Sequence, residues 1–127
     1  MNILITGANG FLGREFARLL SNTEHSIICT NRSNLDVTKE KHVADFFCNH
    51  DIDIVLHTAI KGGRRGRKVC FDEFIKNISM YKNLEKQSDK FKLMFTFGSG
   101  AAFDRSKLID SIEEKYILER IPIDYYG

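Results

Sequence analysis

The sequence lacks the features that mark a metal centre or a membrane protein. Cys29, Cys48 and Cys70 are odd in number and widely spaced, so they form no paired set of metal ligands and are expected to be reduced thiols. No hydrophobic run approaches the length of a transmembrane helix, and the apolar start is too short for a signal peptide and has no basic leader. We therefore expect a cytoplasmic protein with no metal site and no membrane partner.

The sequence also lacks a large excess of either positive or negative charge. The 127 residues carry a formal net charge of +2, and 43% of them are hydrophobic, as expected for one globular domain spanning residues 1–127. Such a balance predicts neither a nucleic-acid partner nor a membrane surface. The most basic segment, residues 61–68, has no aromatic residues between its charges, which also disfavours nucleic acid. Two interpretations of this segment stay open: a solvated loop, or a contact with the phosphates of a ligand.

The stretch Thr6–Gly13 reads Thr-Gly-Ala-Asn-Gly-Phe-Leu-Gly and lies between an apolar strand pattern and an apolar helical stripe. Strand, glycine turn and helix together form the context of a dinucleotide site. Gly7 suits the tight turn off the strand, Gly10 a close approach of backbone to a diphosphate, and Gly13 close packing of helix on strand. The alternative is a glycine turn that binds nothing. The predicted cofactor turn consists of Gly7, Asn9, Gly10, Phe11, Leu12 and Gly13.

Strand and helix patterns alternate along the chain, which predicts a doubly wound α/β fold with helices on both faces of a parallel sheet. Apolar runs predict strands at residues 1–5, 25–30, 51–57 and 91–97, and the expected sheet has five strands in all. Helical spacing predicts helices at residues 14–20, 39–50 and 69–90 and from Ser106 onward. We expect the strand order 3-2-1-4-5, with a ligand at the carboxyl ends of the strands.

The motif Thr-Gly-x-x-Gly-x-x-Gly at the N-terminus resembles the fingerprint of the extended short-chain dehydrogenase/reductase family, the NAD(P)-dependent sugar-nucleotide epimerases, dehydratases and reductases. The resemblance covers nearly the whole chain and implies a Rossmann fold and hydride transfer at a sugar carbon. Segments around Arg32, Asp36 and Lys61 further resemble the GDP-fucose synthase branch. Ala101 stands where that branch has a catalytic cysteine, so the sequence departs here from the residues that the epimerisation step of that branch uses.

The position about twenty residues after the glycines decides between the two nicotinamide cofactors. An acid there binds the ribose 2′-hydroxyl of NAD, whereas an arginine suits the 2′-phosphate of NADP. This chain has Arg32 and no acid, so NADP is expected, with NAD or a merely solvated Arg32 as the alternatives. The resemblance implies that residues 35–37 form a short third strand and that Asp36, next to Val37, accepts a hydrogen bond from the adenine amine. An Asp there could also cap the next helix.

A second stretch, after the fourth predicted strand, resembles the family's His-x-Ala-Ala turn, which borders the two riboses of the cofactor. The residues implied by this resemblance are Thr58, Ala59, Ile60 and Lys61. His57, just before them, is a lone histidine at a strand end, which is more often packed than catalytic.

The resemblance implies three catalytic residues. Ser99 would hold the substrate oxygen, Tyr126 would move the proton, and Asn77 would organise the proton relay. A plain turn serine and a solvated asparagine remain the alternatives. Tyr126-Gly127 fits the start of Tyr-Gly-x-Ser-Lys, whose lysine would fall at position 130. We therefore expect a cofactor-binding portion that lacks the C-terminal substrate lobe and has little or no turnover by itself.

Partners follow from the same resemblance. A sugar nucleotide would be the substrate of the full-length enzyme, and the helix at residues 69–90 would build a homodimer. Two other kinds of protein stay open: a non-enzymatic NADP-binding regulatory domain on the same fold, and a partner-dependent module whose sheet edge pairs with another chain.

Overall fold

A computed structural model describes residues 1–63, 68–99, 113 and 115 of the chain. The chain separates into two compact units. The first unit consists of residues 1–60 and 76–97, and the second of residues 61–75 and 98–127. The first unit contains every strand of the described residues, so the fold of the sheet is a property of that unit.

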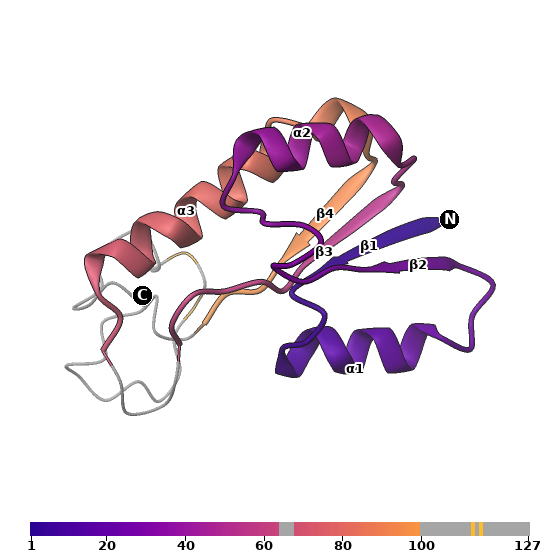
Figure 1. Cartoon of the computed structure of the whole chain (residues 1–127). Helices are drawn as coiled ribbons and strands as arrows, with labels where there is room; N and C mark the ends of the chain where they lie inside the picture. The colour runs from indigo at the N-terminus through magenta and orange to yellow at the C-terminus, as the bar shows by residue number, and fades with distance from the viewer. Residues whose placement is uncertain (64–67, 100–112, 114, 116–127) are drawn as a thin grey trace. The chain divides into compact units, whose positions relative to one another are not determined.

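The sheet of the first unit has four parallel strands in the order β2-β1-β3-β4 (Figure 1). They are β1 (Asn2–Thr6), β2 (Ser26–Cys29), β3 (Ile54–His57) and β4 (Leu93–Thr96). In the register, Leu4 of β1 pairs with Ile28 and Val55, and Val55 pairs with Met94. The chain moves from β1 outward to β2 and then crosses to β3 on the other side of β1, so the order reverses between β1 and β3.

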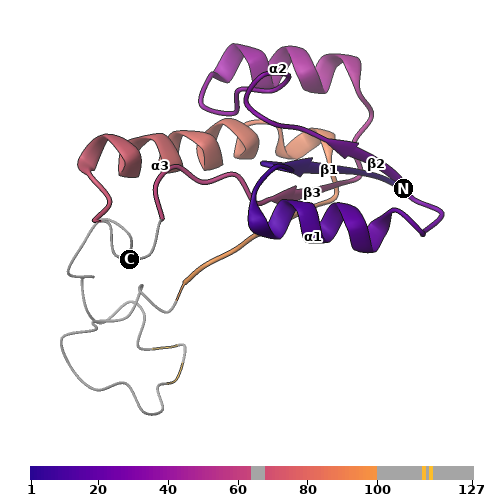
Figure 2. The same cartoon turned by 60° about the horizontal axis from the view of Figure 1, so that its bottom comes forward.

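Helices cover both faces of this sheet. Figures 1 and 2 show α1 (Phe11–Leu20) on one face and α2 (Glu40–Asn49) and α3 (Phe71–Glu85) on the other, and a short 3-10 helix, η1 (Ser88–Lys90), follows α3. Alternate residues of β1 serve the two faces, because successive side chains of a strand point to opposite sides. Ile3 and Ile5 pack with Phe16, Ala17 and Leu20 of α1. Leu4 packs in the cluster that contains Val43, Phe47, Met80 and Leu84 of α2 and α3.

The predicted doubly wound parallel fold is confirmed, but the strand predicted at residues 35–37 is wrong. The backbone there forms turns: Leu35 N–H donates to the Asn31 carbonyl at 2.9 Å, and Lys39 N–H donates to the Asp36 carbonyl at 3.0 Å. These backbone groups therefore do not join the sheet, which has four strands within residues 1–63 and 68–99. The helix predicted from Ser106 lies outside the described residues.

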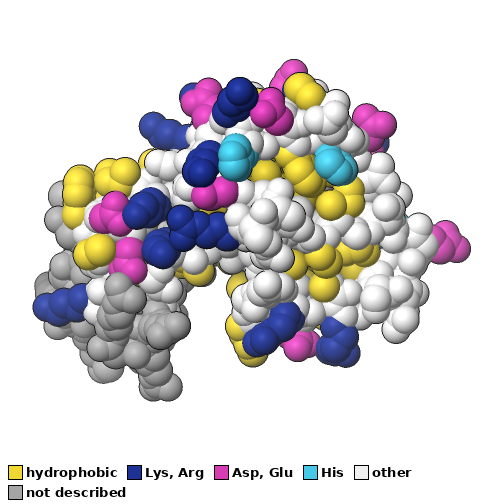
Figure 3. Space-filling model, viewed as in Figure 1, with side chains coloured by type: hydrophobic (Ala, Val, Ile, Leu, Met, Phe, Trp, Pro, Cys, Tyr) yellow, Lys and Arg dark blue, Asp and Glu magenta, His cyan; other side chains and the backbone are white. Residues whose placement is uncertain are grey.

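Charged side chains of both signs are interspersed over α2 and α3 on the face seen in Figure 3. One link between the two helical regions is the ion pair of Lys86 Nζ with Glu40 Oε2, at 2.6 Å. All three cysteines are free and exposed. In the ranges that the structure describes, no helix is long and apolar enough to cross a membrane, and no three His, Cys, Asp or Glu side chains gather as metal ligands.

Candidate nucleotide-binding site

The turn between β1 and α1 is tight at Gly7, whose φ of +71° lies in the left-handed region that favours glycine. A Cβ on Gly7 would come within 2.6 Å of the Ala59 Cα and 2.8 Å of the Ala59 nitrogen. The Gly7 carbonyl accepts a hydrogen bond from Gly10 N–H at 2.8 Å, which closes the turn. Gly7 thus brings the turn after β1 into direct contact with the backbone that follows β3.

Gly13 is buried in the first turn of α1. A Cβ on this residue would lie 2.4 Å from the Gly7 carbonyl oxygen and 2.7 Å from the Ala8 Cα, both of which are backbone atoms that cannot rotate away. Gly10 differs, because its φ of −76° and ψ of 174° suit any residue. Within the described part of the chain, a Cβ there would meet only the Gly7 oxygen, at 3.1 Å. We call residues 7–13 the glycine turn.

The amino end of α1 is open. The residue before it, Gly10, has no side chain to cap the helix, and the first turn contains no acidic residue. The first N–H groups of a helix have no acceptor within the helix and carry the positive end of its dipole. The side chains of Phe11 and Leu12 beside them are 77% and 40% exposed. This end of α1 can therefore accept an anion such as a diphosphate.

Side-chain hydrogen bonds join the carboxyl ends of the three strands next to the glycine turn. Thr6 Oγ1 lies 2.8 Å from His57 Nδ1, and Thr58 Oγ1 donates to the Thr6 carbonyl at 2.7 Å. Thr30, after β2, donates through Oγ1 to the Ile5 carbonyl at 3.1 Å and accepts a hydrogen bond from Ala8 N–H at 2.8 Å. Burial lowers the pKa of His57 to about 4, so the ring is neutral at pH 7 and serves in packing.

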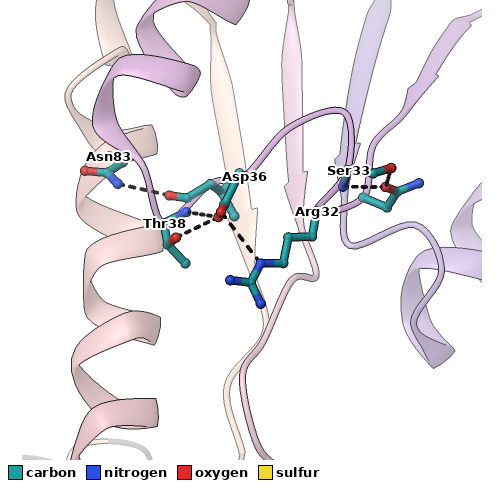
Figure 4. Close-up of polar contacts among 7 residues, drawn as sticks. Arg32, Ser33, Asp36, Thr38 and Asn83 are labelled. Carbon is teal, nitrogen blue, oxygen red and sulfur yellow. Dashed lines mark hydrogen bonds and ion pairs between the residues drawn. The ribbon is translucent and has the colours of Figure 1, made fainter.

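The loop after β2, residues 30–39, is held by side chains and is here called the β2 loop. Asp36 lies at its centre, with its side chain only 10% exposed, between Thr38 and Arg32 (Figure 4). Its Oδ1 accepts hydrogen bonds from the Thr38 hydroxyl at 2.6 Å and the Thr38 N–H at 3.1 Å, and its Oδ2 lies 3.6 Å from Arg32 Nε. The bond from the Thr38 hydroxyl is the largest cause of the lowered pKa of Asp36, with Arg32 adding to it.

Asp36 does not cap the helix that follows. The N-cap position of α2 is Lys39, and the Asp36 carboxylate is used by Thr38 and Arg32 instead. Arg32 itself has a side chain that is 74% exposed. Its charged guanidinium reaches into solvent after the end of β2, which lies next to β1 in the sheet. The guanidinium is therefore available to an anionic ligand.

The first unit brings most of the predicted cofactor residues to one edge of the sheet. Gly7 contacts Ala59, Gly13 contacts the Gly7 carbonyl, and Thr58 donates to the Thr6 carbonyl at the end of β1. The other predicted residues that belong to this unit are Asn9, Gly10, Phe11, Leu12, Arg32, Asp36, Val37, Ile60 and Asn77. Ile60 is 59% exposed, and Asn77 is a half-buried residue of α3.

The remaining predicted residues belong to the second unit. Lys61 and Ser99 are exposed residues of that unit, and Ser99 follows β4 in the sequence. Tyr126 lies outside the described residues. The catalytic roles of Asn77, Ser99 and Tyr126 therefore stay predictions.

Sequence reasoning missed two residues that hold the β2 loop. Thr38 fixes the Asp36 carboxylate, and the buried Asn83 of α3 donates through Nδ2 to the Val37 carbonyl at 3.0 Å (Figure 4). A signal for Asn83 was present, because asparagine is unfavourable inside a helix and needs a compensating partner. Its partner lies 46 residues away in sequence, so no local pattern identifies it.

The strand order of the parallel sheet reverses between β1 and β3, and at that point the glycine turn leads into the open amino end of α1. This combination defines a Rossmann-type nucleotide-binding unit. Comparison with known proteins agrees with this class. Residues 1–61 match the sequence model of the RmlD substrate binding domain family. The predicted resemblance to the extended short-chain dehydrogenases/reductases is confirmed for this N-terminal part of the chain.

Two curated relatives each match about half of the chain. GDP-L-colitose synthase from Yersinia pseudotuberculosis is 30% identical over 64 residues, which make up 50% of this chain and 21% of that protein. A probable dTDP-4,6-dihydroxy-2-methyloxan-3-one 4-ketoreductase from Streptomyces antibioticus is 39% identical over 59 residues, or 46% of this chain and 20% of that protein. The matches thus span about a fifth of the length of these relatives.

Solved structures resemble a longer part of the chain. A dTDP-4-dehydrorhamnose reductase from Clostridium acetobutylicum is similar with a TM-score of 0.81 and 26% identity, over 100% of this chain and 45% of that one. A GDP-L-fucose synthetase from Naegleria fowleri bound to NADP has a TM-score of 0.83 and 21% identity, over 98% of this chain and 42% of that one. The relatives are thus reductases and synthases of nucleotide sugars.

Proposed function

We propose that this chain provides the NADP(H)-binding portion of a nucleotide-sugar reductase or epimerase. The observation that carries the proposal is the glycine turn: Gly7 and Gly13 have no room for a Cβ, and behind them the amino end of α1 is uncapped. A turn built only to connect a strand to a helix has no need of an open helix end, whereas a diphosphate needs free N–H groups at that position.

NADP rather than NAD is proposed because of Arg32. This side chain is exposed in the β2 loop, at a position where an arginine suits the 2′-phosphate of NADP. A protein that uses NAD has an acid at this position, which binds the ribose 2′-hydroxyl. The Naegleria fowleri relative is bound to NADP, and a GDP-D-glycero-L-gluco-heptose synthase from Campylobacter jejuni with the same fold was crystallised in the presence of NADPH. Both facts support the choice.

The reaction of the whole enzyme is proposed to be hydride transfer at a carbon of a sugar nucleotide. NADP(H), when bound, supplies the hydride or accepts it. Ser99 would hold the reacting oxygen by a hydrogen bond, Tyr126 would give or take its proton, and Asn77 would order the relay behind it. Because the lysine that would lower the pKa of Tyr126 falls at position 130, we propose that residues 1–127 alone bind cofactor with little or no turnover.

Two further parts of the proposal concern the protein as a whole. A homodimer through α3 is supported by Ile78 and Tyr81, two large side chains on this helix that are 38% and 41% exposed. A cytoplasmic location is supported by three free, exposed cysteines.

Gly10→Ala separates binding from folding in the test of this proposal. The φ and ψ of Gly10 suit alanine, and the new Cβ meets only the Gly7 oxygen at 3.1 Å, so the variant is expected to fold. Calorimetric titration with NADP⁺ should then show affinity reduced at least about ten-fold, because the methyl group stands where backbone approaches the diphosphate.

Gly98→Ala is the matched control, since among the residues that the structure describes no atom lies within 4 Å of a Cβ placed there. It should bind NADP⁺ as the wild type does. Unchanged binding by a correctly folded Gly10→Ala variant would contradict the proposed use of the glycine turn.

A further inference from the structure

The Asp36 carboxylate divides its two oxygens between two partners. Oδ1 accepts both the hydroxyl and the backbone N–H of Thr38, and Oδ2 faces Arg32 Nε at 3.6 Å (Figure 4). Two hydrogen bonds from one residue fix the rotation of a carboxylate, so Thr38 determines the direction in which Oδ2 points. The ion pair with Arg32 is therefore oriented by Thr38 as well as by Asp36.

The guanidinium is held by its Nε side. The ion pair joins Asp36 to Nε of Arg32, and Figure 4 draws no dashed line from the carboxylate to either terminal amino group. A guanidinium recognises a phosphate through a planar pair of N–H donors, and its terminal amino groups can supply that pair. The contact with Asp36 thus limits the motion of the side chain without using its terminal donors.

The carboxylate is itself fixed to the body of the first unit. The segment between Asp36 and Thr38 is attached to α3, because the buried Asn83 amide donates to the Val37 carbonyl at 3.0 Å. The side chain of Asp36 is 10% exposed, whereas that of Arg32 is 74% exposed. A buried, anchored anion therefore holds an exposed cation that has many rotamers.

We propose that Asp36 is a positioning residue for cofactor choice: with Thr38 it holds Arg32 by Nε and so presents the terminal amino groups to the 2′-phosphate of NADP. The inference rests on the proposed function. It assigns selectivity to the pair of Asp36 and Arg32, whereas a contact between Asp36 and adenine would serve NAD and NADP equally.

The opposite effect is conceivable on charge alone, because a carboxylate close to Arg32 repels a phosphate. The two effects predict opposite changes in the preference for NADP⁺ over NAD⁺ when the carboxylate is removed. If positioning dominates, Asp36→Asn weakens NADP⁺ binding relative to NAD⁺. If charge repulsion dominates, the same change strengthens it. Asparagine keeps an oxygen that can accept from Thr38, so the variant preserves the turn and removes mainly the pairing with Arg32.

The experiment measures the ratio of the Kd values for NAD⁺ and NADP⁺ by calorimetry in the wild type, Asp36→Asn and Thr38→Val. We expect the preference for NADP⁺ to fall about three- to ten-fold in Asp36→Asn and about two-fold in Thr38→Val, which retains the charge and loses the orienting hydroxyl. In an Arg32→Ala background, Asp36→Asn should leave the ratio unchanged.

Asp53→Asn is the matched control. It removes a carboxylate from another ion pair, which Asp53 forms with Lys92 Nζ at 2.7 Å. Asp53 lies just before β3, at the amino ends of the strands, so the change should not alter the ratio of the two Kd values. A preference that rises or stays constant in Asp36→Asn overturns the inference while the proposed function stands. A wild type that binds neither nucleotide overturns the proposed function, and the inference with it.

Discussion

The glycine turn and the β2 loop both belong to the proposed cofactor site, but different forces hold them. Backbone sterics define the glycine turn, where a Cβ on Gly7 or Gly13 would overlap with backbone atoms. Side-chain polar contacts define the β2 loop, through Asp36, Thr38 and Asn83. A steric requirement tolerates no substitution, whereas a network of hydrogen bonds can lose one member at a moderate cost.

The largest effect that this comparison predicts is at Gly13. Gly13→Ala places a methyl group 2.4 Å from the Gly7 carbonyl oxygen, so either the turn or the start of α1 must move. We expect the free energy of unfolding, measured in urea, to fall by about 3 kcal/mol or more. Gly98→Ala, whose new Cβ has no atom of the described residues within 4 Å, should change it by less than about 0.5 kcal/mol. Equal stability of the two variants would break the distinction between the regions.

The next effect concerns His57, which lies at the end of β3 beside the glycine turn. Burial lowers its pKa to about 4 from the ordinary 6.5, so the unfolded chain binds a proton in a pH range where the folded chain does not. Stability from this residue is complete above pH 6.5 and is lost as the pH falls from 6.5 to 4, by up to about 3 kcal/mol.

Unfolding free energies measured at several pH values check this expectation. His57→Asn should flatten the curve between pH 6.5 and 4, since the group that titrates is gone. His42→Asn, at an exposed position of α2, should leave the curve as in the wild type. A slope that persists in His57→Asn would assign the pH dependence to other residues.

The smallest of these effects is expected in the β2 loop. Asn83→Leu keeps the approximate volume of the side chain and removes the donor to the Val37 carbonyl, at a cost of about 1–3 kcal/mol for a buried acceptor left without its partner. The exposed neighbouring residue provides the control, Lys82→Ala, which should cost less than about 0.5 kcal/mol. A loss in Asn83→Leu as large as that in Gly13→Ala would remove the contrast between a steric and a polar region.

The same contrast explains what could be predicted from the sequence. Steric requirements are local, so the glycine turn and four of the five predicted strands were readable from short stretches. The order of those four strands also agrees with the prediction, because parallel strands joined by helices permit few topologies.

The β2 loop could not be predicted in the same way. The family resemblance implied a short strand at Leu35-Asp36-Val37, but Asp36 bonds to Thr38 two residues later and turns the chain. The contact of Asn83 with Val37 depends on tertiary packing across 46 residues. The pairing of Arg32 with Asp36 likewise depends on the fold of the loop, although the choice of Arg32 as a cofactor residue came from its position in the sequence alone.

The β2 loop is proposed to select NADP through Arg32. Calorimetric titration of the wild type and of Arg32→Ala with NADP⁺ and NAD⁺ tests it most directly. We expect the wild type to bind NADP⁺ about ten-fold or more tighter than NAD⁺. Arg32→Ala should lose that preference with its NAD⁺ affinity unchanged. Equal affinities of the wild type for the two nucleotides, or a preference that survives the removal of Arg32, would contradict it.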